Sequence, residues 1–267
     1  MDRMVQTALN SLKMIMENQS ATAHNLANIN TPGFRQDVAV DFTSIFLDRK
    51  EGIEPRILSS RNTGGFSVEQ GQMENTQNPM DVAIKNDGYF IIEPKNGGIA
   101  LSRRGDFQTN ENGELLDGAG NKILDDGLQP IVIPAFSKIE FSPQGQIRIR
   151  AIGQEPDAPP VEVGLIATYK PVEEENVKLK KSLDGHIRIV QDEQDENGNL
   201  VETEGEIIAN QQAELISGFL EKSNVNAIEE MVNTIDQQRK FEMHIKMIKL
   251  ADELDQAGTS LMRMPGM

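Results

Sequence analysis

The side chains considered first for catalysis or metal binding in this sequence are its carboxylates and histidines. Its 267 residues include no cysteine. The absence of cysteine excludes disulfides, thiolate nucleophiles and cysteine-ligated zinc. The three histidines, His24, His186 and His244, are scattered, and none belongs to a His-Glu-x-x-His zinc motif. Any two of the 42 acidic residues could be matched for cleaving a glycosidic bond, but that reaction depends on the distance between two carboxyl groups in space. We therefore predict that the protein is not an enzyme.

One acidic segment comes near the pattern of a calcium loop. In residues 193–198, oxygen-bearing side chains precede a glycine, and Leu200 and Glu204 follow. The first ligand position holds Glu instead of Asp and no helices flank the segment, so we interpret it as an acidic hairpin turn; ion binding by residues 192–204 stays an open alternative. Residues 118–120 (Gly-Ala-Gly) lack the third glycine of a dinucleotide site and are also interpreted as a turn. We expect no cofactor.

Charge and hydropathy exclude further classes of partner. The formal net charge of -16 and the lack of a basic stripe argue against nucleic acid. No run approaches the length of a membrane-spanning helix, and polar residues interrupt the first 19 residues, where a secretory signal would need an apolar core. We expect no membrane insertion, and any export from the cytoplasm to proceed without a cleaved Sec signal.

The elements that must position any site begin with a long N-terminal helix, from Met4 to about residue 28. Its apolar positions recur at spacings of three and four, as one narrow stripe typical of a coiled coil: Val5, Ala8, Leu12, Ile15, Gln19, Thr22 and Leu26. Pro32 lacks the amide proton that a helix needs, and Gly33 can take the positive φ of a type II turn. The helix should therefore end near Asn30, with Phe34 leaving the turn as an apolar anchor.

A second long helix is predicted at the other end of the chain. Residues 218–226 are interpreted as a turn into it, with Asn226 as N-cap and Glu229 three residues on, and the helix can run to about Met262. One apolar row is expected to pair with the N-terminal helix: Met243, Met247, Leu250, Leu254, Ala257 and Leu261. A second row lies beside it and is expected to meet other subunits: Phe241, Ile245 and Ile248.

Between the helices, short apolar runs divided by Asn-Gly and Asp-Gly turns indicate an all-β region. The expected strands are residues 89–93, 99–103, 122–124, 130–133, 139–142, 147–151, 161–168 and 187–191. The predicted fold is α+β, in which the terminal helices pair as a coiled coil around a central all-β domain. The expected divisions are residues 1–35 (helix and turn), 36–70 (connector), 71–215 (β domain) and 216–267 (C-terminal helix).

The two ends of the chain also hold 10 of the 12 methionines. Methionine suits surfaces that must pack against slightly different neighbours. A helix pair with an apolar row left over can bind other subunits, and a contact that does not close on itself makes a helical filament. We expect a helical assembly; the alternative is a monomeric β-rich binding scaffold.

Three separated groups of residues resemble the bacterial flagellar rod and hook family. The first is Asn25-Leu26-Ala27-Asn28 with Thr31, Gly33 and Phe34. The second runs through Gln70-Gly71, residues 78–84 and 87–90, and continues at Arg103, Gly105, Phe107 and residues 113–115. The third comprises residues 218–221, 223–226 and 230–232, with Gln238, Arg239, Phe241 and Glu242. Within the family, the opening Met1-Asp2-Arg3 and residues 31–35 look most like the proximal rod component; the distal rod or hook subunit is the alternative.

This resemblance implies a structural subunit of the flagellar basal-body rod. Such a subunit polymerises through its terminal helices into the axial rod that transmits torque across the periplasm, and leaves the cell through the flagellar type III export apparatus without signal cleavage. Its implied partners are other rod proteins, copies of itself and that apparatus. The residues expected to serve assembly are Asn25, Leu26, Asn28, Thr31, Pro32, Gly33, Phe34, Ser223, Asn224, Val225, Asn226, Met231, Arg239 and Phe241.

Overall fold

The computed structural model describes residues 2–38, 43–45, 58–60, 65–153, 159–171, 177–182, 184–194 and 200–262. The chain forms two compact units. Unit 1 comprises residues 1–27, 37–65 and 226–267, and unit 2 comprises residues 28–36 and 66–225. Residues 28–35, which the sequence-based division placed with the N-terminal helix, lie in unit 2.

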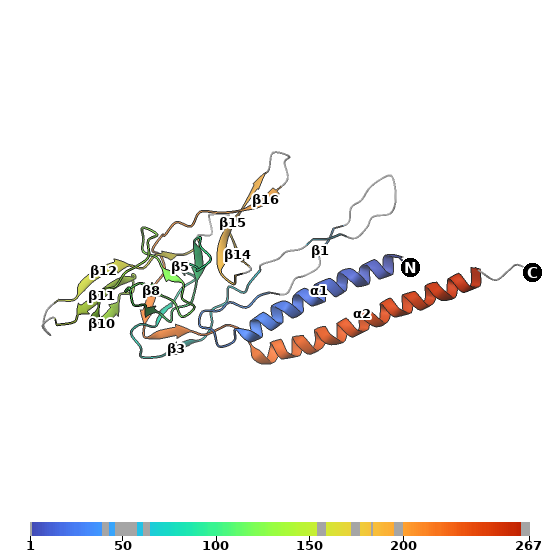
Figure 1. Cartoon of the computed structure of the whole chain (residues 1–267), viewed down its shortest axis with the longest axis horizontal. Helices are drawn as coiled ribbons and strands as arrows, with labels where there is room; N and C mark the ends of the chain where they lie inside the picture. The colour runs from blue at the N-terminus through green and yellow to red at the C-terminus, as the bar shows by residue number, and fades with distance from the viewer. Residues whose placement is uncertain are drawn as a thin grey trace, which may run out of the picture. The chain divides into compact units, whose positions relative to one another are not determined.

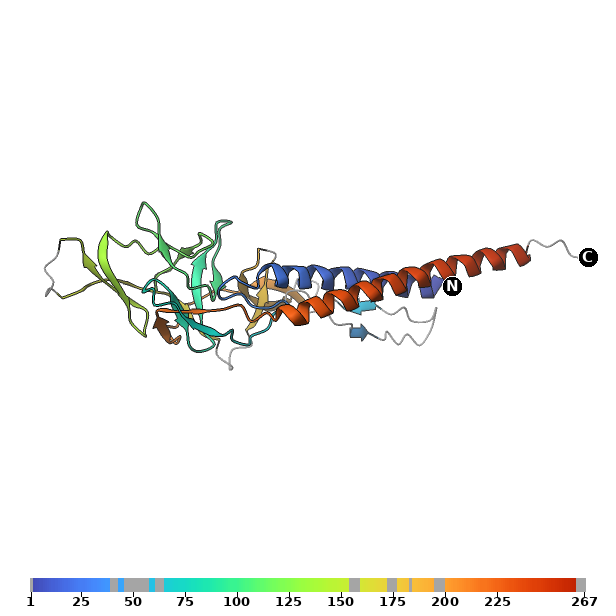
Figure 2. The same cartoon turned by 90° about the horizontal axis from the view of Figure 1, so that it is seen from below.

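Unit 1 is a pair of long helices, α1 (Asp2–Ala27) and α2 (Ala227–Met262), which lie side by side (Figures 1 and 2). They run antiparallel, since Asn25 contacts Glu230 while Thr22, earlier in α1, contacts Gln237, later in α2. Two short strands, β1 (Thr43–Ile45) and β2 (Leu58–Ser60), pair antiparallel in the same unit. The predicted pairing of the terminal helices is confirmed.

The predicted stripe of α1 is buried at Ala8, Leu12, Ile15 and Thr22. Its last buried position is Asn25, whereas Leu26 is only half-buried. α1 ends at Ala27, three residues before the expected end, because the chain turns at once: the Thr31 N–H donates to the Asn28 carbonyl at 3.1 Å. At the other helix, Asn226 caps α2 as predicted, its Oδ1 accepting the Ile228 N–H at 3.1 Å.

The expectation for the two rows of α2 was wrong. The row expected against α1 is exposed, by 55% at Met243, 51% at Leu250 and 52% at Leu254. The row expected to face other subunits, Phe241, Ile245 and Ile248, is half-buried. Residues two apart, such as Ile248 and Leu250, are separated by about 200° around a helix, so only one row can face α1. The apolar period of α2 fits either choice, and contacts with α1 decide between them.

Unit 2 is built from antiparallel strands around β5 (Tyr89–Glu93), whose side chains enter two cores. Phe90 and Ile92 pack in one cluster, and Tyr89 and Ile91 in the other, as the two-residue period of a strand requires. The nine-stranded sheet has the order β14-β15-β6-β5-β9-β8-β7, with β13 on β5 and β16 on β15. Its strands are β6 (Ala100–Ser102), β7 (Gln108–Thr109), β8 (Leu115–Leu116), β9 (Lys122–Ile123), β13 (Thr168–Tyr169), β14 (Lys178–Lys181), β15 (Ile187–Gln194) and β16 (Leu200–Glu204).

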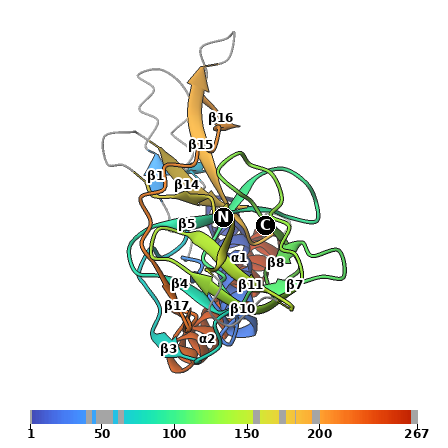
Figure 3. The ribbon, with the colours of Figure 1, turned by 90° about the vertical axis from the view of Figure 1, so that its left-hand side faces the viewer.

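Smaller sheets complete unit 2. A three-stranded sheet has β11 in its centre, and Figure 3 shows β10 beside β11. Two further pairs join distant parts of the chain: β17 pairs with β4, and β18 with β3. The strands are β3 (Met73–Asn75), β4 (Val82–Ile84), β10 (Phe136–Phe141), β11 (Gln146–Ala151), β12 (Val161–Leu165), β17 (Leu215–Ser217) and β18 (Phe219–Glu221).

The structure corrects two predictions in this region. Residues 130–133 form isolated bridges instead of a strand, with Pro130 opposite Leu124 and Val132 opposite Glu114. The expected turn into α2 holds β18, because Gly218, at φ 79°, turns the chain between two short strands that pair with β3 and β4. The acidic segment joins antiparallel strands, with Gln194 opposite Leu200, but residues 195–199 lie outside the described residues. Most of the expected connector, 39–42, 46–57 and 61–64, also lies outside them.

Candidate functional site

Asn25, the first residue of the N-terminal motif, is the centre of a polar cluster within unit 1. Its side chain is buried, 2% exposed, and its Nδ2 donates to Glu230 Oε1 at 2.9 Å and to the Asp37 carbonyl at 3.0 Å. Its Oδ1 accepts the Asp37 N–H at 2.7 Å. A buried amide is costly unless its donors and acceptor are paired. Asn25 therefore ties the end of α1 to the first turn of α2 and to the backbone of Asp37.

Gly33 shows why the turn after α1 needs glycine. Its φ is +66°, as the type II turn interpretation required, and its N–H donates to the Glu221 carbonyl at 2.7 Å. A Cβ on Gly33 would lie 2.3 Å from the backbone C and O of Arg103. The turn can therefore pack on the backbone of Arg103 only without a side chain at this position.

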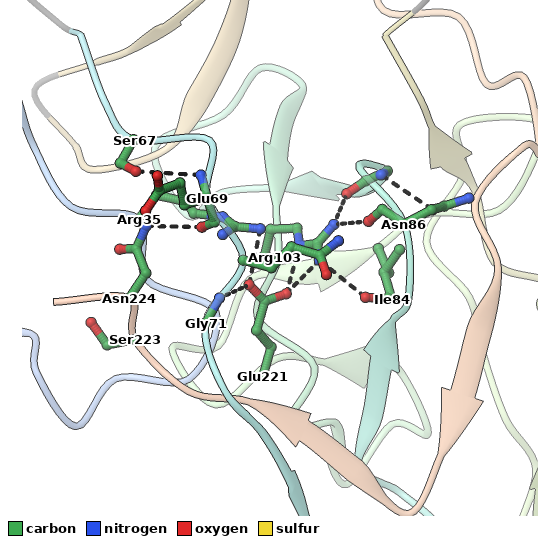
Figure 4. A network of polar contacts seen from close by, with 12 residues as sticks. Arg35, Ser67, Glu69, Gly71, Ile84, Asn86, Arg103, Glu221, Ser223 and Asn224 are labelled. Carbon is green, nitrogen blue, oxygen red and sulfur yellow. Dashed lines mark hydrogen bonds and ion pairs between the residues drawn. The ribbon is translucent and has the colours of Figure 1, made fainter.

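A buried ion network follows the turn within unit 2 (Figure 4). Glu221 on β18 accepts from Arg35 at 2.9 Å through Oε1, and from Arg103 Nε at 2.8 Å through Oε2. The Gly71 N–H also donates to Oε1, at 3.0 Å. The three charged side chains are at most 2% exposed. Each comes from a different one of the three family-like motifs, so segments far apart in the sequence meet at one carboxylate.

Arg103 also binds backbone carbonyls across the neighbouring strands. It donates to Gly88 O at 2.6 Å, to Ile84 O at 3.0 Å and to Asn86 O. Burial lowers the pKa of Arg103 below its ordinary value, while the Glu221 carboxylate opposes that shift. Burial also raises the pKa of the nearby Tyr89 phenol, although the positive charges of Arg35 and Arg103 oppose it.

Phe34 and Asn224 complete the attachment of the turn to unit 2. The Phe34 ring lies under Lys181, whose Nζ is 3.7 Å from the ring centre, a cation–π contact. Asn224 accepts the Gln36 N–H at 2.7 Å through Oδ1 and donates to Glu69 O at 2.9 Å through Nδ2. The segments before residue 37 and before α2 are thus joined directly.

The structure distributes the predicted assembly residues over three environments. Asn25 and Val225 are buried. The half-buried ones are Leu26, Asn28, Thr31, Pro32, Gly33, Phe34, Ser223, Asn224 and Phe241, and the exposed ones are Asn226, Met231 and Arg239. The prediction missed the charged residues that hold these segments together: Arg35, Asp37, Arg103, Glu221 and Glu230. Four of the five, Arg35, Arg103, Glu221 and Glu230, lie inside or at the end of the quoted motifs. Charged residues of opposite sign in separate motifs were therefore the sequence signal that could have predicted these contacts.

α2 also presents a row of exposed apolar side chains along most of its length: Ile228 75%, Met231 53%, Val232 52%, Ile235 51%, Met243 55%, Met247 37%, Leu250 51% and Leu254 52%. The row lies about 200° around the helix from the residues that meet α1, as Ile235 and Gln237 illustrate. α2 is therefore a two-faced helix, with one face on α1 and an apolar face in solvent.

Within the part of the chain that the structure describes, no three His, Asp or Glu side chains gather as a metal site requires. The described helices include none with the length and apolar character of a membrane span. The structure defines three features: a polar cluster at Asn25 in unit 1, an ion network at Glu221 in unit 2, and an exposed apolar row on α2.

Comparison with known proteins identifies two segments that match flagellar families. Residues 216–261 match the family described as flagellar basal body rod FlgEFG protein C-terminal. Residues 83–149 match the D1 domain of the flagellar hook protein FlgE/F/G.

Similar proteins cover almost the whole chain. The flagellar basal-body rod protein FlgF of Salmonella typhimurium is 31% identical over 264 residues, which span 99% of this chain and 100% of that protein. FlgF of Escherichia coli is 29% identical over 95% of each chain. The flagellar basal-body rod protein FlgG of Buchnera aphidicola is 29% identical over 89% of this chain and 91% of the relative.

Proposed function

The chain belongs to the flagellar basal-body rod protein family, and from that premise we propose that the exposed apolar row of α2 binds helices of neighbouring subunits in the rod. The protein is a structural rod subunit, not an enzyme, and it assembles with other rod subunits. The observation that carries the proposal is the apolar row itself, defined by the eight residues from Ile228 to Leu254 given above.

Two properties of the row support this role. A row of exposed apolar side chains of this length is uncommon on a monomer and is typical of a binding surface. Three of its eight members are methionines, Met231, Met243 and Met247, whose flexible side chains can adapt to neighbours in slightly different positions. Arg239 lies within the same row, where its aliphatic stem can pack while its charge stays in water.

The contact should be heterologous. If the apolar row of one subunit binds a different surface of the next, the contact repeats without closing and generates a helical filament. The half-exposed methionine and leucine on the outer side of α1, Met16 at 59% and Leu9 at 48%, supply such a different surface.

Charged substitutions in the row test the proposal. Met243→Asp with Leu250→Asp should leave the thermal unfolding of the purified chain unchanged, because both side chains are exposed by more than half. The same variant should fail to restore swimming in a strain that lacks its own copy, and should be missing from isolated basal bodies.

The matched control is Asn233→Asp with Gln256→Asp. Both side chains are exposed on α2, outside the apolar row, and the control adds the same two negative charges. Normal swimming with the control and none with the row variant supports the proposal. Normal incorporation of the row variant would refute it.

Within the rod, we place this protein as the proximal component, with other rod proteins and copies of itself as neighbours. The match with a FlgF protein over 99% of this chain and 100% of that protein supports this position. Complementation separates the two positions: the gene should restore rods in a strain without its FlgF protein and not in one without its FlgG protein. Rescue of only the second strain would assign the distal position.

We also propose export through the flagellar type III apparatus without cleavage, into the part of the rod that crosses the periplasm and transmits torque. The polar residues at the start of α1, such as Asn10, Lys13 and Glu17, support an uncleaved N-terminus. The intact mass of the subunit from isolated basal bodies should equal that of the full sequence. A shortened N-terminus would contradict this route.

A further inference from the structure

We infer that two polar contacts, the buried Asn25–Glu230 and the partly buried Thr22–Gln237, set the register of α1 against α2. The inference concerns a single chain. The register decides which residues of α2 lie level with α1, and so where along α1 the apolar row is presented. The inference rests on the proposed function only for this use of the register. No step of the argument requires a neighbouring subunit.

The first observation is that the helix seam is polar at one end. Glu230 is 2% exposed and accepts from Asn25 at 2.9 Å; Gln237 Nε2 donates to Thr22 Oγ1 at 3.1 Å, and Thr22 is 6% exposed. The two contacts are one heptad apart on α2. A seam selected only for stability would be apolar at these positions, whereas buried polar residues in a coiled coil specify register at a cost in stability.

That cost is visible in the structure. Gln237 Oε1 and His244 Nδ1 are buried without a hydrogen-bond partner among the described residues. Such atoms lose their bonds to water and regain none. The polar groups of the seam therefore lower the stability of the helix pair, while the two hydrogen bonds form together in only one alignment.

The pair of alanines near the far end of the seam contributes little to the register. Two heptads along each helix from Thr22 and Gln237 lie Ala8 and Ala251, which are 3% and 2% exposed. Small side chains such as these let helices approach closely but would accept a slide of one heptad almost as well. Steric fit between these two alanines therefore discriminates weakly.

A slide of one heptad breaks both polar contacts. In one direction, Gln237 comes level with Ile15, which is 4% exposed and offers no hydrogen bond. In the other direction, Gln237 passes beyond Ala27, where α1 ends. Glu230 leaves Asn25 in both cases, but in the first direction Asn18 comes level with it and offers another amide, so the Thr22–Gln237 contact is the one that distinguishes this slide. Only the observed alignment satisfies both pairs.

Engineered cysteine pairs measure the register directly, because the chain has no cysteine of its own. Ala8→Cys with Ala251→Cys reports the observed alignment. Ala8→Cys with His244→Cys, and Ala8→Cys with Gly258→Cys, report slides of one heptad in either direction. In the purified full chain, the first pair should form a disulfide, and each shifted pair at least about tenfold less, since a slide of one heptad breaks the Thr22–Gln237 hydrogen bond.

The decisive variant removes the polar groups of α2 only, by Glu230→Leu with Gln237→Leu. Asn25 keeps both hydrogen bonds to the Asp37 backbone. With this change, the shifted pairs should crosslink to within a few-fold of the 8/251 pair, while the melting temperature of the helices stays equal or rises. A purely stabilising role for these contacts would lower the melting temperature and leave the shifted pairs unlinked.

The matched control is Asn233→Leu with Gln238→Leu, which adds the same apolar bulk on exposed positions of α2 and should leave the crosslinking pattern unchanged. The inference is overturned if shifted pairs crosslink freely in the unsubstituted background, if they stay unlinked in the Leu variant, or if the control gives the same loss of register. Because crosslinking uses a single chain, a failure of the apolar row to mediate assembly would leave this result standing.

Discussion

Glu221→Gln should be among the most damaging conservative substitutions in unit 2. The change keeps the shape of the side chain and one carbonyl oxygen but removes the negative charge that Arg35 and Arg103 share. Both guanidinium groups are at most 2% exposed, so solvent cannot replace the lost charge. Removing one partner of a buried ion pair costs about 3–5 kcal/mol, and here two cations remain, which favours the upper part of that range.

The network also predicts a rescue. Arg35 Nε and Nη1 are buried without a hydrogen-bond partner among the described residues, so Arg35 depends on Glu221 more than Arg103 does. Arg103 keeps its contacts with the carbonyls of Ile84, Asn86 and Gly88. Replacing Arg35 by Met in the Glu221→Gln background removes one unpaired charge, and the double variant should therefore be more stable than Glu221→Gln alone.

Urea unfolding followed by tyrosine fluorescence is the appropriate assay. The chain has two tyrosines and no tryptophan. Tyr89 and Tyr169 are both buried in unit 2, at 3% and 4% exposure, so the signal reports on that unit. A loss of less than about 1 kcal/mol for Glu221→Gln, the value of an exposed ion pair, or a double variant less stable than the single one, would refute the reasoning.

Two further predictions concern the turn after α1 and the response to acid. Gly33→Val should lower the amount of protein built into basal bodies, because it combines a positive φ with a clash at Arg103. The control is Gly97→Val, where φ is +81° but a Cβ meets no atom within 4 Å. Normal motility with Gly33→Val would contradict the packing argument. Burial lowers the pKa of His186 below its ordinary 6.5, so the unfolded chain binds more protons in this range and unit 2 should lose stability as the pH falls below about 6.5. His186→Asn should flatten that part of the urea-unfolding profile, and an unchanged slope would show that other groups cause it.

Local chemistry was enough to predict many elements. β5 begins and ends as expected, because an apolar run between two turn signals leaves few alternatives. The N-cap at Asn226 and the positive φ of Gly33 follow from the residue types at those places. The sequence analysis missed the pairs β3–β18 and β4–β17. A strand of three residues carries almost no periodic signal, and these strands form only because distant segments of the chain pair.

The sequence by itself determined that two long helices flank a β-rich region and to which family the motifs point. Tertiary structure decided which face of α2 meets α1, because two apolar rows share the same period and only the contacts of Asn25 and Thr22 distinguish them. It also decided that Arg35, Arg103 and Glu221 form one buried network. Charges far apart in a sequence have no local signature of pairing; their partnership is created when the chain brings them together away from water.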